Sequence, residues 1–409
     1  MPTQPQTYIN GKPDNGLAYD WNLIKKTYKS LNCPSEYYDP TTAPLASAKY
    51  FCELSDRSTG KTTNWILLGL CAYWLYGCQT IYVRQFSDHI APKYTQNLWS
   101  VIIQNGYIEK LTGGVYNHIT YKSRRWYLCK NNKGDITDID DTPCMFMCSV
   151  DKAMDLKSSA NFPLGDIILY DEFIGKFYTP NEFVHFCDLV KTIIRERHSP
   201  IVVMLANTID KHSQYFNELE VYDEVQVMHQ GDHQLITTDR GTKIYVEMIG
   251  ASQAKKKKRS FVNKLFFGFN SPEMAAITGD DDWAVSNYQH IPEPVEDALD
   301  DRPDYDYLIR NLYIFHNQKY ARLDIVKHKV LGIICYVHWA TRVYDDSIIL
   351  TCQDRQDPRY YYRFGPPRVA RLIEKLNKTN GFYFASNDVG SFVTNYVKYA
   401  QKISPLMPG

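Results

Sequence analysis

Short apolar runs alternate with longer helix-like stretches between residue 46 and about residue 215 of the chain. The apolar runs have the length and composition of buried strands. Strands that alternate with helices predict a mostly parallel α/β sheet that is covered by helices on both faces. The expected strands are Lys49–Glu53, Thr80–Arg84, Trp126–Cys129, Cys144–Cys148, Ile167–Tyr170 and Ile201–Ala206, and the expected helices are Lys61–Tyr76, Tyr94–Gln104 and Asn181–Arg195.

The pattern changes on either side of this region. The first 45 residues are polar and rich in turn residues, with one amphipathic piece at Trp21–Leu31, which predicts an N-terminal arm. An acidic stretch from Asp280 to Asp301 contains two prolines and is typical of a linker. Apolar and polar positions alternate again after residue 305 and give way to two helix-like stretches, which predicts a second, strand-rich α/β module. The expected divisions are 1–45, 46–220, 221–303 and 304–409.

Composition narrows the possible classes of protein. Hydrophobic residues make up 44% of the 409 positions and charged residues 22%, which is ordinary for a globular protein. The 46 basic and 46 acidic residues cancel, so any contact with nucleic acid must come from a local patch. We see no apolar run of the roughly 20 residues that span a bilayer and no signal peptide, so no membrane partner is expected. The ten cysteines include Cys144 and Cys148 but no second pair, so reduced thiols are expected and not a zinc site.

Candidate chemistry begins at Gly60-Lys61-Thr62, which lies between an expected strand and an expected helix. A strand, a tight loop and a helix N-terminus in this order form an anion site, because backbone N–H groups and the helix dipole face the phosphates. Lys61 can reach the β- and γ-phosphates, and the Thr62 hydroxyl can hold Mg²⁺. The expected nucleotide-binding residues in this loop are Ser55, Asp56, Arg57, Ser58, Thr59, Gly60, Lys61, Thr62 and Thr63.

The loop departs from the usual phosphate-loop pattern, because Ser55 stands where the first glycine is expected. Gly-Lys-Ser/Thr also arises by chance in chains of this length, so the motif needs support from elsewhere. Arg57 is expected either to project towards the phosphates or to brace the glycine-poor turn through a salt bridge.

The segment Ile167–Tyr170 supplies that support, because it is followed directly by two acids. Asp171 at the carboxyl end of a buried strand can coordinate Mg²⁺, and Glu172 can polarise the attacking water. An ordinary strand that ends in an exposed acidic pair is the alternative. A glutamate directly after the metal-binding aspartate is typical of ATPases that couple turnover to mechanical work.

Three further polar residues complete the candidate site. Asn207 follows the Ile201–Ala206 strand and can sense the γ-phosphate, and Arg84 ends the Thr80 strand and is expected to point into the same crevice. Arg195 follows a helix-like stretch and could act as an arginine finger on the neighbouring subunit's nucleotide. Arg197 is the less favoured candidate for this role, and a basic residue that only complements the dipole at a helix C-terminus is the alternative for both arginines.

Together these motifs resemble the phi29-like DNA-packaging ATPases of tailed phages, which are motors of the large-terminase type. The order and spacing agree over roughly residues 46 to 220. The residues that carry the resemblance are Ser55–Thr62, Ile81–Arg84, Arg124–Tyr127, Ile168–Ile174, Thr192–Arg197, Leu205–Asn207 and Tyr215-Phe216.

The resemblance implies an ASCE-type P-loop ATPase domain at 46–220, a basic lid and linker at 221–303 and a degenerate RNase H-like domain at 304–409. It also implies a homopentameric ring at the portal vertex of a procapsid in the host cytoplasm. Such a ring translocates double-stranded DNA with ATP and Mg²⁺, and some members also need a structural RNA. The catalytic residues would then be Lys61, Glu172 and, from the neighbouring subunit, Arg195.

DNA contacts are expected mainly in a basic block. Lysine and arginine attract the phosphate backbone without reading its sequence, although a solvated surface tract is the alternative. The residues of this block are Lys255, Lys256, Lys257, Lys258, Arg259 and Lys264.

The module at 304–409 offers few acids for a two-metal nuclease, which needs carboxylates that converge on metals about 4 Å apart. Asp324 and the pair Asp345-Asp346 are the candidates, and we expect a fold without nuclease activity. Further nucleic-acid or portal contacts are expected at Arg355, Arg359, Tyr360–Tyr362 and Arg363.

Three alternatives remain open at this point. A helicase-like translocase would share the ATPase core but act on a different track. A terminase would carry an active C-terminal nuclease. A nucleotide-binding module without catalysis would keep Lys61 but would not depend on Glu172.

Overall fold

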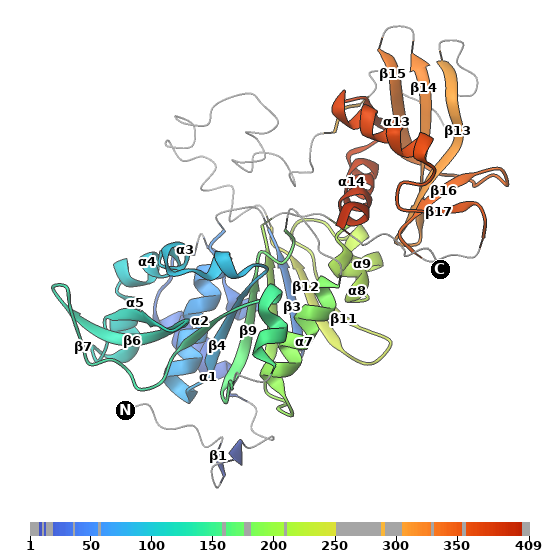
Figure 1. The fold of residues 1–409 in the computed structure, drawn as a ribbon. Helices are drawn as coiled ribbons and strands as arrows, with labels where there is room; N and C mark the ends of the chain where they lie inside the picture. The colour runs from blue at the N-terminus through green and yellow to red at the C-terminus, as the bar shows by residue number, and fades with distance from the viewer. Residues whose placement is uncertain are drawn as a thin grey trace.

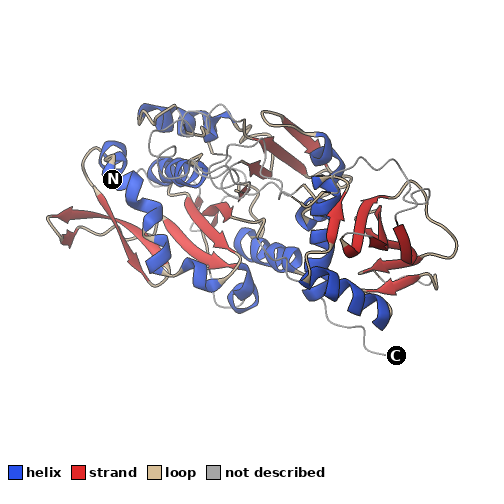
Figure 2. Ribbon diagram, turned by 90° about the horizontal axis from the view of Figure 1, so that it is seen from above, coloured by secondary structure: helices blue, strands red, loops and turns tan. Residues whose placement is uncertain are grey.

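The structure is a computed structural model of the 409-residue chain. Figures 1 and 2 show two lobes, each built around its own β-sheet. The described residues are 8–9, 12–13, 19–35, 37–55, 59–157, 161–175, 181–207, 211–250, 288–290, 305–328, 331–353 and 357–402.

The large lobe contains a ten-stranded sheet whose central six strands all run in parallel. In spatial order these are β12 (Lys243–Met248), β3 (Tyr50–Leu54), β10 (Ile201–Ala206), β9 (Gly165–Asp171), β4 (Gln79–Arg84) and β8 (Met145–Ser149). Antiparallel strands extend both edges: β11 (His233–Thr237) pairs with β12, and β6 (Arg125–Asn132) joins β8 to β5 (His118–Lys122) and β7 (Asp135–Thr137).

Helices cover both faces of this sheet, as the alternation of strands and helices predicts. Along β3, Phe51 belongs to the hydrophobic core on one face and Cys52 to the core on the other, because successive residues of a strand point to opposite sides. The first face is covered by α1 (Trp21–Ser30), α2 (Lys61–Tyr76), α4 (Asn97–Gln104) and α5 (Tyr107–Thr112). The second face is covered by α6 (Ala153–Leu156), α7 (Glu182–Ile194), α8 (Gln214–Glu218) and α9 (Tyr222–Val227).

Short elements complete the described part of this lobe. They are α3 (Pro92–Thr95) and the 3₁₀ turns Pro40–Thr42, Ser87–Ile90 and Val150–Lys152. A separate pair of antiparallel strands, β1 (Tyr8–Ile9) and β2 (Lys12–Pro13), precedes them in the chain. The single helix expected at Tyr94–Gln104 is wrong, since the structure has α3 and α4 there. The Trp99 N–H bonds to the Gln96 carbonyl, a tight i→i−3 bond of 3.2 Å that marks the junction.

The part of the N-terminal region from Tyr19 to Leu45 packs onto the large lobe. Its helix α1 begins after Asp20, whose carboxylate accepts the N–H groups of Asn22 (3.0 Å) and Leu23 (3.1 Å). Ile24 and Tyr28 on α1 are buried in the same core as α2. The predicted amphipathic piece is therefore a helix that covers α2.

The small lobe is a six-stranded sheet covered on one face by two helices (Figure 1), in agreement with the strand-rich α/β module expected there. The hydrophobic core beneath the helices joins Leu323 and Ile325 of the sheet to Leu376 and Phe392 of the helices. In spatial order the strands are β17 (Tyr360–Tyr362), β16 (Ile348–Thr351), β13 (Tyr305–His316), β14 (Lys319–His328), β15 (Gly332–Trp339) and β18 (Phe382–Phe384), and the helices are α13 (Pro367–Lys378) and α14 (Asn387–Lys402).

The pairing in this sheet is mixed. β13, β14 and β15 form an antiparallel meander, whereas β16 and β17 run parallel to β13, and β18 runs parallel to β15. The RNase H-like assignment of this lobe remains a prediction. Within the described residues, no helix is long and apolar enough to cross a membrane.

The helix α2 lies unusually close to β4 at Gly69. A Cβ atom added to Gly69 would lie 2.3 Å from the Thr80 hydroxyl oxygen, which is too short for any real contact. Glycine at this position therefore allows the close approach of α2 to the amino end of β4.

We predict that Gly69→Ala lowers the free energy of unfolding by about 1–3 kcal/mol through overpacking. The sign is informative, because a glycine-to-alanine change inside a helix ordinarily stabilises by roughly 0.5–1 kcal/mol. Urea denaturation of Gly69→Ala, Thr80→Ala and the double variant measures this, and the loss should shrink when both changes are combined. A Gly69→Ala protein as stable as wild type would contradict the packing argument.

An acidic pair, one member fully buried and the other half-buried, lies beneath the phosphate loop. Glu53 on β3 is fully buried, and its two carboxylate oxygens accept hydrogen bonds from the Tyr38 hydroxyl (2.7 Å) and the Trp65 indole N–H (2.6 Å). Glu247 stands opposite it on β12, with its Oε2 3.0 Å from the Tyr38 hydroxyl. Burial, with the charge of Glu247, raises the pKa of Glu53 to about 8, although the two hydrogen bonds and the charge of Lys61 oppose the shift.

This pKa predicts a specific dependence of stability on pH. An unfolded glutamate titrates near pH 4.3, so between about pH 5 and pH 8 the folded chain holds a proton on Glu53 that the unfolded chain has released. Stability therefore falls as the pH rises through this window and levels off above it. We expect Glu53→Gln to flatten this fall in urea unfolding, whereas the exposed control Glu109→Gln does not. Equal slopes for Glu53→Gln and wild type would overturn the assignment.

Candidate nucleotide site

The residues singled out in the phosphate loop, after β9, after β10 and at the end of β4 meet at one edge of the central sheet. β3, β10, β9 and β4 are neighbours and run in the same direction, so their carboxyl ends lie together. Lys61 begins the helix after β3, Asp171 ends β9 and Asn207 follows β10. The fold therefore brings these residues to the same edge of the sheet.

Gly60 and Lys61 form the turn into α2. Gly60 has a φ of +82°, and a Cβ atom there would lie 2.8 Å from a ring carbon of Tyr37, so only glycine fits without strain. No side chain caps the start of α2, and its first turn contains no acid. The N–H groups of this turn are thus available to an anion.

The Lys61 side chain is 3% exposed and folds back over its own loop. Its ammonium donates to the hydroxyls of Ser55 and Thr59 (3.5 Å) and to the Asn207 side-chain oxygen (3.2 Å). Ser55 is buried, and its hydroxyl also lies 2.9 Å from that of Thr59. The serine that replaces the expected glycine therefore closes the loop and holds the lysine.

Three residues predicted in the loop, Asp56, Arg57 and Ser58, lie outside the described residues. The bracing role expected for Arg57 therefore stays a prediction. Thr63 lies half-buried in the first turn of α2.

Oxygen atoms of Thr62 and Asp171 lie side by side, as a magnesium site requires. The Thr62 hydroxyl donates to Asp171 Oδ1 at 3.0 Å, and the Tyr82 hydroxyl donates to Asp171 Oδ2 at 2.7 Å. Hard oxygen ligands of this kind suit Mg²⁺, which takes one or two protein ligands and completes its shell with phosphates and water. No group of three or more His, Cys, Asp or Glu side chains that could hold a metal occurs among the described residues, so the protein would supply only this pair.

Arg84 lies between the two acids of the site. Its guanidinium contacts Glu172 Oε2 and lies 3.5 Å from Asp171 Oδ2. Burial opposes the charged form, but the neighbouring Tyr82, Asp171 and Glu172 outweigh it and raise the pKa of Arg84 above its ordinary value. Glu172 itself has a φ of +56°, an uncommon backbone geometry that is found at functional positions.

Two residues that support the site, Tyr82 and Glu182, were not predicted from the sequence. Tyr82 shares a face of β4 with Arg84, two positions away, and this spacing was the available signal. Glu182 is 3% exposed and accepts hydrogen bonds from Gln85 and from the hydroxyls of Tyr215 (2.6 Å) and Tyr170 (3.4 Å). Gln85 and Tyr170 adjoin Arg84 and Asp171 in the chain, so Glu182 ties the ends of β4 and β9 to α7 and α8.

The two candidate finger arginines have different environments. α7 leads from the carboxyl end of β9 to the amino end of β10, so Arg195 at its C-terminus lies at the opposite edge of the sheet from Lys61. Arg195 is exposed and has an unusual backbone, with φ +49° and ψ −115°. The Arg197 side chain is 9% exposed and pairs with Asp166 at 2.6 Å, and it also donates to the carbonyls of Pro163 and Ile193. Arg197 therefore braces the fold, whereas the finger role of Arg195 stays a prediction.

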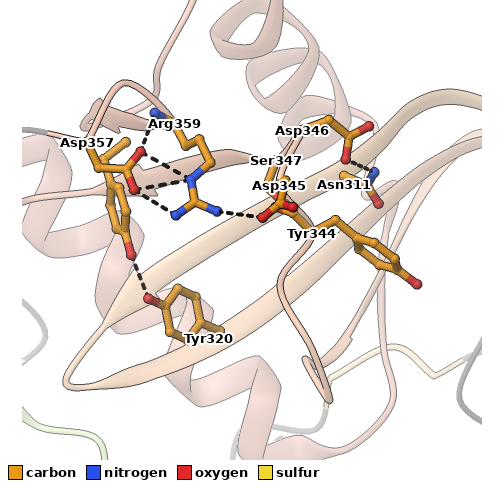
Figure 3. Close-up of polar contacts among 9 residues, drawn as sticks. Asn311, Tyr320, Tyr344, Asp345, Asp346, Ser347, Asp357 and Arg359 are labelled. Atoms are coloured by element: carbon orange, nitrogen blue, oxygen red, sulfur yellow. Dashed lines mark hydrogen bonds and ion pairs between the residues drawn. The ribbon is translucent and has the colours of Figure 1, made fainter.

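The acids of the small lobe do not converge. Asp324 is fully buried between Arg322 (2.9 Å) and His338 (3.0 Å). Asp345 and Asp346 lie in an exposed turn, where Asp346 accepts a hydrogen bond from Asn311 at 2.8 Å (Figure 3). This arrangement gives no support to the alternative of an active nuclease.

The basic residues expected to contact nucleic acid are mostly engaged or not described. Figure 3 shows the Arg359 guanidinium held by Asp357, with Nη2 2.7 Å from Oδ2, and facing Asp345 at 3.7 Å. The Arg363 Nε donates to the carbonyl of Ala400 at 2.7 Å. Arg355 and the basic block Lys255–Arg259 with Lys264 lie outside the described residues.

Comparisons with known proteins place the chain by its fold. No protein-family model matches the sequence, and no curated protein matches it. The Phi-28 gp11 DNA packaging motor is similar in structure, with a TM-score of 0.52 and 15% identity over 91% of this chain and 100% of that one. The bacteriophage Phi-29 genome packaging motor gives a TM-score of 0.51 and 16% identity over 88% and 98%. The chain therefore has the α/β fold of these viral packaging motors along most of its length.

Proposed function

We propose that the protein is an ATPase that drives double-stranded viral DNA into a preformed capsid as a subunit of a ring-shaped motor. One observation carries this proposal: Lys61, Thr62, Asp171, Glu172 and Asn207 meet at the carboxyl edge of a parallel sheet. The same residue types in the same sheet order bind and hydrolyse nucleoside triphosphates in P-loop enzymes. The structural likeness to two packaging motors supports DNA as the polymer that the proposed motor moves.

Each side chain has a defined task in this proposal. Lys61 exchanges its contacts with Ser55 and Asn207 for the β- and γ-phosphates of ATP, and the exposed N–H groups of α2 receive the same phosphates. Thr62 and Asp171 would hold Mg²⁺, which neutralises charge on the phosphates when it is bound. Asn207, which now accepts from Lys61, detects the loss of the γ-phosphate.

Glu172 is the proposed general base for the attacking water. Its carboxylate contacts the Arg84 guanidinium, so this contact must open before Glu172 can face the attacking water. The remaining charge in the transition state is stabilised by Arg195 of the neighbouring subunit, since Arg195 lies too far along the sheet to serve its own site.

The ring, which we propose to be a homopentamer, would act at the portal of the procapsid in the host cytoplasm. The basic block Lys255–Arg259 with Lys264 is the proposed contact with the DNA backbone, because the whole chain has no net charge to attract it. We propose the small lobe as a domain of RNase H type that binds partners and does not cut DNA.

Glu172→Gln tests the catalytic assignment. We expect ATP hydrolysis to fall roughly 10²–10⁴-fold because the general base is lost, while nucleotide binding persists. Steady-state ATPase assays with double-stranded and single-stranded DNA measure this, with the exposed Glu109→Gln as a control. Unchanged hydrolysis would show that Glu172 is not the base, and stimulation by single strands alone would favour a helicase.

The two arginines make a second, paired test. Arg195→Ala should leave stability nearly unchanged, lower hydrolysis about 10³-fold or more, and also lower the activity of wild-type subunits in mixed rings. Arg197→Ala should instead destabilise the fold by about 3–5 kcal/mol, because Asp166 is left buried without its partner. Mixing assays and urea denaturation separate the effects, and additive activity in the mixtures would argue against a shared site.

A further inference from the structure

Tyr38, Glu53 and Glu247 form a cluster whose contacts call for one proton more than ionised side chains supply. The Tyr38 hydroxyl oxygen lies 2.7 Å from Glu53 Oε1 and 3.0 Å from Glu247 Oε2. A hydroxyl carries a single proton, so Tyr38 can donate to only one of the two acids. The other acid must be protonated and donate to the Tyr38 oxygen. The geometry therefore has Glu53 and Glu247 share one proton through Tyr38.

The surroundings of the pair favour this proton. Glu247 stands directly opposite Glu53 on the neighbouring strand, so two ionised carboxylates would repel each other. Burial, with the charge of Glu247, raises the pKa of Glu53 to about 8, and burial also raises the pKa of Glu247. The other titratable groups that face the pair are Tyr38 from the N-terminal region, Lys61 from α2, Tyr245 from β12 and His233 from β11.

Hydrogen bonds tie the cluster directly to the phosphate loop. The Tyr38 N–H donates to the Thr59 carbonyl at 2.9 Å, and the Asn64 side-chain amide donates to the Tyr38 carbonyl at 2.7 Å. Thr59 belongs to the loop and Asn64 to the first turn of α2. The residue that joins the two acids is thus also a residue that holds the loop in place.

Lys61 links the cluster to the nucleotide through its charge. The ammonium lowers the pKa of Glu53 and so opposes the effect of burial. Lys61 is 3% exposed, so water screens its field at Glu53 only weakly. In the proposed function the ammonium pairs with phosphates, which offsets its field and brings negative charge towards the acids. Negative charge favours the protonated form of a carboxyl group.

We propose that the Glu53–Tyr38–Glu247 cluster is a proton-binding site linked to the nucleotide site, so that nucleotide binding takes up a proton from solution and nucleotide release returns it. The proton joins the carboxylate that was ionised, and no other bond is made or broken. This linkage requires the nucleotide binding proposed at Lys61. Because linkage is reciprocal, nucleotide affinity falls as the pH rises through the range in which the free cluster loses its proton.

Calorimetric titration of the full chain with Mg²⁺-ADP, in buffers of different ionisation enthalpy, measures the protons taken up for each nucleotide bound. The phosphates of ADP are ionised at about pH 8, since the last pKa of a phosphate is about 6. If the nucleotide favours the protonated cluster about tenfold, uptake is about 0.4 proton at about pH 8 and about 0.1 at about pH 7. Affinity is then about fivefold weaker at about pH 9 than at about pH 7. Uptake that is equal at the two lower pH values would overturn the proposal.

Variants locate the proton. Glu53→Gln should bind Mg²⁺-ADP without uptake at about pH 8, because the glutamine amide always has a proton to donate to the Tyr38 oxygen. Glu247→Gln should behave in the same way and replaces Glu53→Gln if that variant does not fold. The exposed control Glu109→Gln should keep the uptake of the wild type. Equal uptake in the wild type and in the folded variants would overturn the proposal.

Infrared difference spectra of the chain without nucleotide test the proton count by itself. We expect the carbonyl band of a protonated carboxyl group at about pH 7 in the wild type, and its loss in Glu53→Gln or Glu247→Gln. A wild type without this band would show that both acids are ionised and would overturn the shared proton, whatever the nucleotide does. A wild type that shows the band but binds no Mg²⁺-ADP would refute the proposed nucleotide site, and the linkage with it.

Discussion

The parallel pairing of β3, β10, β9 and β4 sets the geometry on which the nucleotide site depends. Because these strands run in one direction, the phosphate loop, Asp171 and Asn207 emerge at the same edge within hydrogen-bonding distance of one another. The phosphate loop follows β3 directly, so Lys61 and Thr62 at the start of α2 lie at that edge as well. A change of one residue in the register of β9 would turn Asp171 to the other face of the sheet.

Two kinds of polar contact hold the site. The first kind is made by Glu53 on β3 and Glu182 on α7, which are buried. Their carboxylates accept hydrogen bonds from tyrosine, tryptophan or glutamine side chains. The second kind joins Lys61 to Asn207 and Glu172 to Arg84, and the proposed nucleotide would displace these contacts. A site that changes state with each turnover needs rigid supporting residues and, beside them, contacts that can be exchanged.

The same chain uses arginine in three ways, which its surroundings decide. Arg197 is locked by Asp166 and by main-chain carbonyls, and Arg84 is shared between two acids of the site. Arg359 is held at the surface by Asp357. Arg195, in contrast, is exposed at the C-terminus of α7.

The sequence alone determined the α/β class and most strand positions. It also singled out Lys61, Thr62, Asp171 and Glu172 as candidate site residues. These follow from local patterns, since an apolar run with a polar end or a Gly-Lys-Thr turn is legible without knowledge of the rest of the chain. The tertiary structure alone decided why Ser55 can replace glycine, which of Arg195 and Arg197 is presented outward, and that Tyr82 and Glu182 support the site. The reason is physical: each of these depends on which strands become neighbours, and contacts between residues far apart in the chain leave no periodic signal in the sequence.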